Sequence, residues 1–299
     1  PHLVSSAASD VYKRQKKNKR GATAKNSQSL KPPSAQSSVW SSWWFLLGIV
    51  FVLSVVVLLG IQQFNVAGEI PEIEYTLVDE HPHDDLAFTQ GLVFHEGKLY
   101  ESTGRYGEST LREIDIETGD TLRRVDVAPD LFAEGLCLWN DEWLQLTWKS
   151  NTILHYDRDT LEETRQTSWD RQGWGLTHNG KELIISDGTS RIFFVDPTSN
   201  NVVRKFDVME SGRRRDKINE LEYIDGHLYA NVWYKPYVLK INPANGKVVG
   251  KINLTGPIKK MGLKDRDAVC NGIAYDPASK HFYVTGKLWP KVLEIKLSR

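Results

Sequence analysis

The sequence predicts an all-β protein in which residues 72–299 form a five-bladed β-propeller. Two observations carry this prediction. A motif recurs five times at steps of about one propeller blade, and short strands alternate with turn residues with almost no helical periodicity. A third observation is one spare strand before the first repeat, matched by a missing strand at the end of the last repeat. An apolar segment precedes this body, and we expect it to be a single N-terminal transmembrane helix.

The first strand of each repeat opens with a short motif. Successive motifs are 44, 40, 45 and 52 residues apart, close to the roughly 40–45 residues of a four-stranded propeller blade. In a propeller this strand is the innermost one of its blade, beside the central channel. The motifs are "QGLVF" at Gln90, "EGLCL" at Glu134, "WGLTH" at Trp174, "NELEY" at Asn219 and "NGIAY" at Asn271.

Further strands follow in each repeat. The second strands occupy residues 98–104, 142–148, 182–188, 227–233 and 281–287. The third strands run into Asp/Asn-Pro or Thr-Gly turns, which are typical strand connections. They occupy residues 110–119, 152–160, 191–199, 237–246 and 292–297. A short fourth strand then appears, for example at residues 122–127, 202–208 and 248–254.

The fifth repeat ends after its third strand, whereas residues 72–80 ("EIEYTLVDE") form a strand that no repeat uses. In a closed ring the spare strand can complete the last blade. That pairing removes the open edge that a sheet otherwise has to protect.

Residues 43–61 ("WWFLLGIVFVLSVVVLLGI") contain no charged side chain and are long enough to cross a bilayer as a helix. Residues 1–31 hold eight Lys or Arg and one acid. The positive-inside rule therefore predicts a cytoplasmic N-terminus and a body in a periplasmic, other extracytoplasmic or lumenal space. A cleaved signal peptide, which would make the body secreted, is the alternative. It fits less well because the apolar run exceeds the usual length of about 7–15 residues.

The remaining boundaries follow from composition. Residues 1–42 are predicted to be a disordered, basic cytoplasmic tail, of which residues 1–15 resemble a translated library sequence and do not enter the fold argument. Residues 62–71 are expected to be a linker. Outside residues 1–31 the chain has 30 basic and 37 acidic side chains, a net charge of −7. This balance argues against a nucleic acid as partner.

Two other features of the sequence, a pair of cysteines and a histidine-rich segment, could carry chemistry of their own. Cys137 and Cys270 begin strands of different repeats, so we expect two buried free thiols, although an exported protein could pair them. The segment "HPHDD" at residues 81–85 could suggest a metal site, but a solvated connection is the interpretation we favour. The chain has no Walker loop, G-x-S-x-G, H-E-x-x-H or Cys/His metal spacing, and we predict neither a metal nor a cofactor.

Polar and aromatic side chains are expected to gather at one mouth of the ring. Four of the five strand-opening residues are polar, whereas a purely structural channel is more often lined by small or apolar groups. Alternation and the ends of the second strands add further side chains to the same mouth. The residues expected there are Phe88, Gln90, Phe132, Glu134, Trp148, Trp174, Asn219, Trp233, Asn271 and Lys287, with Lys149 and Asp187 on the same rim.

Glu134 is the one carboxylate among the strand-opening residues. Apolar walls raise the pKa of a carboxyl and a nearby Lys287 lowers it, so Glu134 could take and return a proton near neutral pH. No Ser–His or Cys–His pairing accompanies it, and covalent catalysis is not indicated. Lys149 is expected to be a surface charge, Asp187 to cap a turn and Asn271 to support the ring.

Seven separated motifs resemble the plant-type, metal-independent glutaminyl-peptide cyclotransferases. They are "FTQGL", "FAEGL", a Trp fourteen residues after Glu134, "WGLTHNG", "SDGT", "NELEY" with a Trp fourteen residues on, and "TGKLW". The resemblance covers about residues 70–299. It implies a five-bladed propeller, in agreement with the repeat count.

The resemblance also implies a reaction: conversion of the N-terminal Gln of peptides or proteins to pyroglutamate, with release of ammonia. The substrate's own α-amine attacks its γ-carboxamide, so the enzyme supplies no nucleophile. Glu134 would be the general acid/base, and Lys287 and Asn219 would bind the carboxamide oxygen or the scissile region. The substrate-binding residues would be Gln90, Phe88, Phe132, Trp148, Trp174 and Trp233.

Two rival functions remain from the residues alone. A non-catalytic propeller that binds peptides or sugars through its aromatic rim would explain the indoles and the anchor, but it explains the carboxylate and the lysine less well. A metal-dependent, lactonase-like hydrolase would gather several carboxylates around one cation, whereas this mouth offers one Glu among amides.

Overall fold

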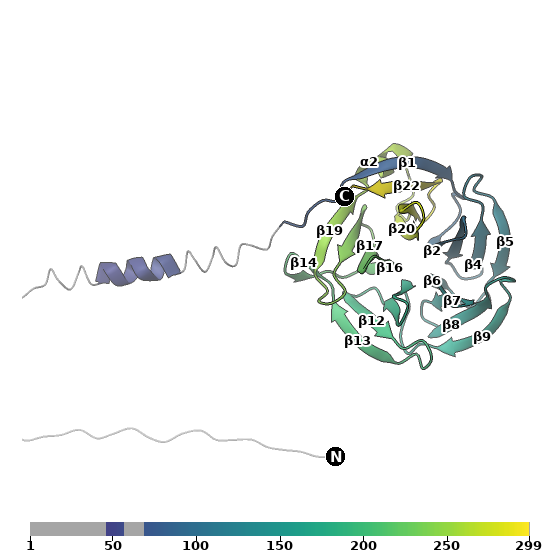
Figure 1. Ribbon diagram of the computed structural model, residues 1–299, viewed down its shortest axis with the longest axis horizontal. Helices are drawn as coiled ribbons and strands as arrows, with labels where there is room; N and C mark the ends of the chain where they lie inside the picture. The colour runs from purple at the N-terminus through teal and green to yellow at the C-terminus, as the bar shows by residue number, and fades with distance from the viewer. Residues whose placement is uncertain (1–45, 57–68, 299) are drawn as a thin grey trace, which may run out of the picture. The chain divides into compact units, whose positions relative to one another are not determined.

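The computed structural model describes residues 46–56 and 69–298. Residues 69–298 contain five four-stranded antiparallel sheets that stand as blades around a central axis (Figure 1). The prediction of a five-bladed β-propeller is therefore confirmed. The chain divides into two compact units, Pro1–Gln62 and Gln63–Arg299, and the propeller belongs to the second unit.

Each blade runs from an inner strand at the axis to an outer strand at the circumference. The first blade consists of β2 (Thr89–His95), β3 (Lys98–Thr103), β4 (Thr110–Ile114) and β5 (Thr121–Asp126). The second consists of β6 (Ala133–Trp139), β7 (Glu142–Thr147), β8 (Thr152–Asp157) and β9 (Glu163–Ser168). The third consists of β10 (Leu176–His178), β11 (Leu183–Ser186), β12 (Arg191–Val195) and β13 (Val202–Asp207). The fourth consists of β16 (Ile218–Ile224), β17 (His227–Val232), β18 (Tyr237–Ile241) and β19 (Val248–Asn253).

The fifth blade joins the two ends of the propeller. Its strands are β20 (Cys270–Asp276), β21 (His281–Gly286), β22 (Lys291–Leu297) and, on the outside, β1 (Tyr75–Pro82). β1 pairs antiparallel with β22 and lies beside it in Figure 1. The spare N-terminal strand therefore completes the last blade, as the sequence predicts, and β22 has no open edge.

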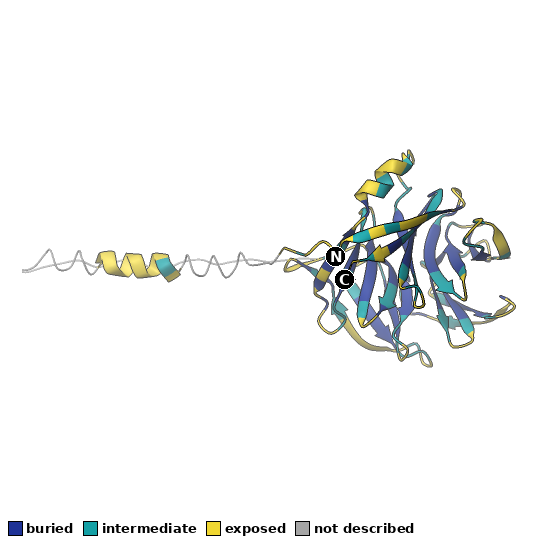
Figure 2. Ribbon diagram, turned by 45° about the horizontal axis from the view of Figure 1, so that its top comes forward, coloured by how far each residue is buried: buried dark blue, intermediate teal, exposed yellow. Residues whose placement is uncertain are grey.

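The inner strands are buried and the outer strands are partly exposed (Figure 2). The inner strands of successive blades also approach one another closely. A Cβ on Gly135 of β6 would lie 2.4 Å from the backbone nitrogen of Leu176 in β10, so a side chain cannot fit there. The glycine that follows the strand-opening residue in four of the five repeats thus permits blade-to-blade contact.

Two small elements were not predicted. Helix α2 (Thr255–Met261) lies between β19 and β20, and it accounts for the longest repeat step. The hairpin of β14 (Met209–Glu210) and β15 (Arg213–Arg214) turns at Ser211 and Gly212, both with positive φ, as a two-residue type I′ turn requires.

In the N-terminal unit, residues 46–56 are helical. The other residues of the expected span 43–61, the tail up to residue 45 and the linker up to residue 68 lie outside the described residues. Among the described residues, no helix combines the length and the apolar character needed to cross a membrane.

The interpretation of residues 81–85 as a solvated connection is wrong for its two histidines. His81 and His83 are buried, because the closure of the fifth blade covers them. His83 Nε2 lies 3.1 Å from Oε1 of the buried Glu101, and Glu101 raises the pKa of His83 against the opposing effect of burial. Cys137 and Cys270 are buried and unbridged, as expected.

Candidate active site

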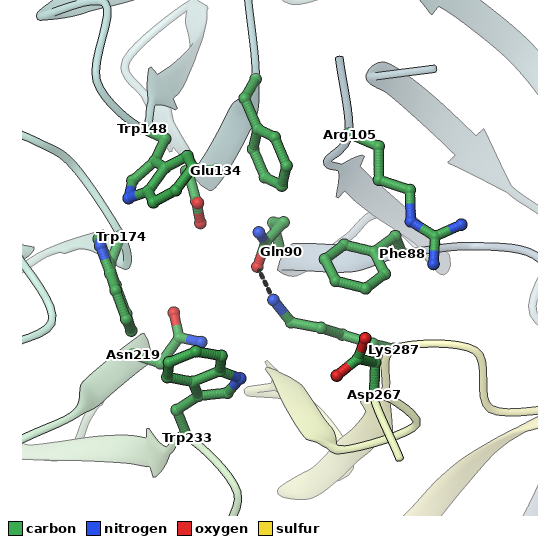
Figure 3. A pocket seen from close by; sticks show the side chains of 11 residues that line it. Phe88, Gln90, Arg105, Glu134, Trp148, Trp174, Asn219, Trp233, Asp267 and Lys287 are labelled. Carbon is green, nitrogen blue, oxygen red and sulfur yellow. Dashed lines mark hydrogen bonds between the residues drawn. The ribbon is translucent and has the colours of Figure 1, made fainter. Parts of the chain in front are cut away.

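Nine of the residues expected at the mouth line one cavity of about 230 Å³ (Figure 3), whereas Asn271, Lys149 and Asp187 do not line it. This volume is below the roughly 300–1,000 Å³ of sites for drug-sized ligands, so the cavity suits one amino-acid side chain with its backbone. The polar members are buried, with exposed fractions of 5% or less, and the aromatic members are half-buried. The polar groups therefore lie at the bottom and the rings form the walls.

A β-bulge positions each polar strand-opening residue. The register between inner and second strands shifts across these positions in four blades. A bulge changes the direction in which the side chain at that point of the strand projects. A polar side chain can therefore depart from the regular alternation of the two strand faces and point toward the axis of the ring. The residues at the bulges are Gln90, Glu134, Asn219 and Asn271.

Glu134, near the start of β6, points into the cavity with 5% of its surface exposed (Figure 3). Burial raises the pKa of Glu134 to about 8, and the positive charge of Lys287 opposes this rise. A carboxyl with this pKa exchanges a proton near neutral pH. No hydrogen bond from another described residue occupies the carboxyl, so it is available to a ligand.

Lys287 follows β21 and reaches the same cavity from the fifth blade. Its ammonium donates a hydrogen bond of 2.5 Å to Oε1 of Gln90, the dashed line in Figure 3. Burial lowers the pKa of Lys287 to about 8, and Glu134 opposes this shift. Asn271 donates to the Thr89 carbonyl at 2.9 Å and to Gln90 Oε1 at 3.3 Å, which fits its expected supporting role.

The aromatic walls form two chains of edge-to-face contacts. Phe132 packs against Phe88 and Trp148, with ring centroids 6.3 and 5.6 Å apart. Trp174 packs against Trp233 at 5.6 Å and also lies on Gly188, where a Cβ would come within 2.5 Å of the indole. These contacts fix the ring orientations before any ligand arrives.

Two polar atoms of the cavity have no partner. Nε1 of Trp174 and Oδ1 of Asn219 are buried and accept or donate no hydrogen bond within the part of the chain that the structure describes. An unpaired buried polar atom is costly. In Figure 3 the Asn219 oxygen faces the centre of the cavity, where the N–H group of a ligand could reach it, whereas the Trp174 nitrogen lies at the outer edge of its ring.

The sequence prediction missed two residues that also line the cavity, Arg105 and Asp267. Arg105 comes two residues after the end of β3, the position that Lys149 holds after β7 in the next repeat, and this equivalence could have revealed it. Asp267 lies between α2 and β20, outside the repeated elements, where no periodic signal exists. Its carboxylate accepts a hydrogen bond of 2.8 Å from the Tyr234 hydroxyl.

Two further residues discussed from the sequence, Asp187 and Lys149, lie near the cavity. Asp187 accepts hydrogen bonds from the backbone and the hydroxyl of Thr189, at 3.0 and 2.6 Å, as a turn-capping residue does. Lys149 is exposed and lies over the Trp148 ring. Across residues 46–56 and 69–298, no group of three or more His, Cys, Asp or Glu side chains is placed to share a metal ion.

Comparisons with known proteins agree with one another. The sequence model of the glutamine cyclotransferase family matches residues 50–297. A glutaminyl-peptide cyclotransferase of Arabidopsis thaliana is 40% identical over 242 residues, which cover 79% of this chain and 74% of that protein. The crystal structure of the Myxococcus xanthus glutaminyl cyclase superposes with a TM-score of 0.73 at 35% identity, covering 77% of this chain and 99% of that one.

Proposed function

The chain belongs to the glutamine cyclotransferase family, and on this premise we propose that Glu134 is the proton-transfer group of its reaction. The chain is a glutaminyl-peptide cyclotransferase, an acyl-transfer enzyme that converts the N-terminal glutamine of a peptide to pyroglutamate and ammonia. The observation that carries the proposed role is the buried Glu134 carboxyl, whose pKa is raised to about 8 and which faces a cavity of one side chain's size.

The reaction needs a proton to move between two nitrogens. The α-amine attacks the γ-carboxamide carbon, a C–N bond forms, and the five-membered lactam closes as the original C–N bond breaks. The amine loses a proton and the departing nitrogen gains one, so ammonia leaves. Ionised Glu134 takes the first proton and returns it to the leaving nitrogen, which conserves protons over the cycle.

The other polar groups stabilise charge that develops on the carboxamide oxygen. Lys287 is a cation that Gln90 holds in place at the bottom of the cavity. Donors fixed in a dry cavity before the reaction stabilise an oxyanion more strongly than water does. Asn219, with its unpartnered Oδ1, holds the scissile region as an acceptor for a substrate N–H.

The aromatic wall contributes by shape. Curling the glutamine side chain toward its own amine costs conformational freedom, and a close-fitting cavity supplies that constraint. Phe88, Phe132, Trp148, Trp174 and Trp233 surround the place where the side chain would lie. They also keep out water, which would hydrolyse the carboxamide to glutamate instead.

The reaction is tested with the full chain and a short peptide that begins with Gln, in water enriched in oxygen-18. Cyclisation releases one ammonia per peptide and leaves a product without oxygen-18, in chelator as in buffer. Incorporation of oxygen-18 would indicate hydrolysis. Activity lost in chelator would support the metal-dependent hydrolase, and no conversion above the spontaneous rate would support the peptide- or sugar-binding propeller.

A second proposal concerns where the enzyme lies relative to the membrane. We infer that residues 43–61 anchor the chain in a lipid bilayer, with the N-terminus in the cytoplasm and the propeller outside it. The uncharged segment, the basic flank and the exposed apolar side chains of residues 46–56 support this inference. Protease added to right-side-out membrane vesicles should cut the propeller and spare an N-terminal tag; the reverse pattern would contradict the orientation.

A further inference from the structure

We propose that the mouth of the cavity selects peptides with an acidic side chain directly after the N-terminal glutamine. The selecting group is a cation collar, defined here as Arg105, Lys149 and Lys217. This inference rests on the proposed function, because it concerns the part of the peptide that leaves the cavity when its first residue occupies it.

Each cation of the collar lies over one aromatic ring of the cavity wall. The Arg105 guanidinium is 4.5 Å from the centroid of Phe88, and Figure 3 shows it beside that ring. The Lys149 amine is 3.8 Å from the Trp148 ring, and the Lys217 amine is 5.3 Å from the Trp233 ring. Cation–π attraction holds such groups in place. The collar thus follows the wall on three sides.

The backbone of two collar residues is in an unfavourable region. Arg105 has φ 93° and Lys217 has φ 66°, where glycine is the usual residue. The Lys217 backbone is held there by hydrogen bonds with Gly188 and Trp233, and the Ser109 hydroxyl donates to the Arg105 carbonyl at 2.8 Å. Among the described residues, ten other non-glycine residues also have a positive φ, so this conformation is not particular to the mouth. The hydrogen bonds hold the backbone of both collar residues in a fixed place beside the cavity.

Nearby carboxylates leave the collar with excess positive charge. Glu108 lies 3.8 Å from Arg105, and its side chain is 67% exposed, so their attraction is weak. Asp267 accepts a hydrogen bond from the Tyr234 hydroxyl, which leaves its negative charge in place, so the three cations of the collar stand against two carboxylates. Neither Lys149 nor Lys217 forms an ion pair with another residue in the described part of the chain. The mouth therefore attracts negative charge from solution.

Arg105 is the collar residue that also lines the cavity, so it lies nearest to the second residue of a bound peptide. A guanidinium matches a carboxylate with two parallel hydrogen bonds, which a lysine amine cannot do. We therefore assign the preference for an acidic second residue mainly to Arg105. Lys149 and Lys217 contribute through their charge, at longer range.

The test uses the full chain and three C-terminally amidated peptides that differ only in the second residue: Gln-Glu, Gln-Ala and Gln-Lys. We expect the wild type to have a kcat/KM about three- to tenfold higher for Gln-Glu than for Gln-Ala, and lowest for Gln-Lys. Because exposed charges are screened by salt, the ratio should fall toward one as ionic strength rises from about 0.01 to 1 M.

Variants assign the effect to the collar. In Arg105→Ala the Gln-Glu to Gln-Ala ratio should fall to below twofold, and in Arg105→Glu the order should reverse in favour of Gln-Lys. Arg105→Gly removes the side chain and relieves the positive φ, so it tests the same point if Arg105→Ala folds poorly. Lys205→Ala removes an exposed cation from the outer strand β13 and should keep the wild-type ratio.

Two results would overturn the collar proposal and leave the cyclase function in place. One is equal kcat/KM values of the wild type for the three peptides. The other is a Gln-Glu to Gln-Ala ratio that stays at the wild-type value in both Arg105→Ala and Arg105→Gly. Failure of the wild type to convert any of the three peptides would instead overturn the proposed function, and the collar proposal with it.

Discussion

At the scale of single residues, the site depends on two ionisable groups whose environments bring their pKa values together. Burial raises the pKa of Glu134 and lowers that of Lys287, both to about 8. A carboxyl with a pKa near 8 can accept and return a proton close to neutral pH, as a relay between the two substrate nitrogens requires. An ammonium with a pKa near 8 is still charged at neutral pH and can stabilise negative charge on the carboxamide oxygen.

The pH dependence of kcat/KM follows from this pair. Ionised Glu134 is needed to accept a proton and its pKa lies near 8, so activity should rise as pH increases toward 8. The Lys287 ammonium is lost above its pKa of about 8, so activity should fall again. We expect a bell-shaped profile with a maximum near pH 8, whose two limbs belong to the pair. A profile that is flat between pH 5 and pH 9 would contradict it.

The Trp174 ring gives a second prediction. Trp174→Phe keeps a ring on Gly188 but removes part of the wall that holds the glutamine side chain curled, so kcat should fall about tenfold, equivalent to about 1.4 kcal/mol. As a control, Trp143→Phe removes a buried indole hydrogen bond outside the cavity and should lower Tm but not kcat. An unchanged kcat in Trp174→Phe would remove Trp174 from the reaction.

At the scale of elements, the inner strands supply both the polar groups and the contacts between blades. A bulge turns the strand-opening side chain into the cavity, and the next residue faces the neighbouring blade. That next residue is glycine in four repeats and Glu220 in the fourth blade. Glu220 Oε2 accepts a hydrogen bond of 2.9 Å from the backbone N–H of Ile273, and so links the inner strands of the fourth and fifth blades.

Glu220 should therefore contribute to stability. Glu220→Ala leaves the buried N–H group of Ile273 without this acceptor, so we expect the free energy of unfolding to fall by about 1–3 kcal/mol, measured by denaturant unfolding. A loss below about 0.5 kcal/mol would show that this bond does not hold the blades together.

Glu220→Gln tests the charge state separately. Burial raises the pKa of Glu220 well above its ordinary value of 4.5, so the folded protein keeps the group neutral where the unfolded chain ionises it. As pH rises above that ordinary value, the unfolded state is favoured and stability from this group is lost. Gln cannot ionise, so the Tm of the variant relative to wild type should increase between pH 5 and pH 8. A constant difference would contradict a neutral Glu220.

Much of this arrangement could be predicted from the sequence, and the reasons for the misses are physical. The nine cavity residues were found because a repeat gives equivalent positions equivalent places in the ring. The bulges could not be predicted, because one extra residue in a strand leaves no periodic signal. The burial of His81 and His83 was missed because only the closure of the ring covers them. Arg105 was missed because it lies two residues beyond the repeated strand β3.

At the scale of the whole molecule, the ring is held closed by pairing between distant ends of the propeller. β1 pairs along its length with β22, and His81 Nε2 lies 2.8 Å from a Glu294 oxygen across this pair. Lys287 and Gln90, on the fifth and first blades, meet inside the cavity that this closure completes. Ring closure and site assembly are therefore linked.

Removal of β1 should open the ring. A chain that begins at residue 83 lacks the outer strand of the fifth blade and exposes the edge of β22, so we expect a Tm at least about 10 °C lower and aggregation on heating. A chain that begins at residue 69 keeps β1 and is the control. A synthetic peptide of residues 72–82 should restore part of the lost Tm; equal Tm values for the two chains would contradict the closure.

The most direct test of the account is the cyclisation rate of Glu134→Gln on a peptide that begins with Gln. Gln keeps the shape of Glu but cannot relay a proton, so kcat/KM should fall by at least about 100-fold, with a Tm no lower than that of wild type. A folded Glu134→Gln with a kcat/KM within about threefold of wild type would show that Glu134 does not carry the proton, and the mechanism proposed here would be wrong.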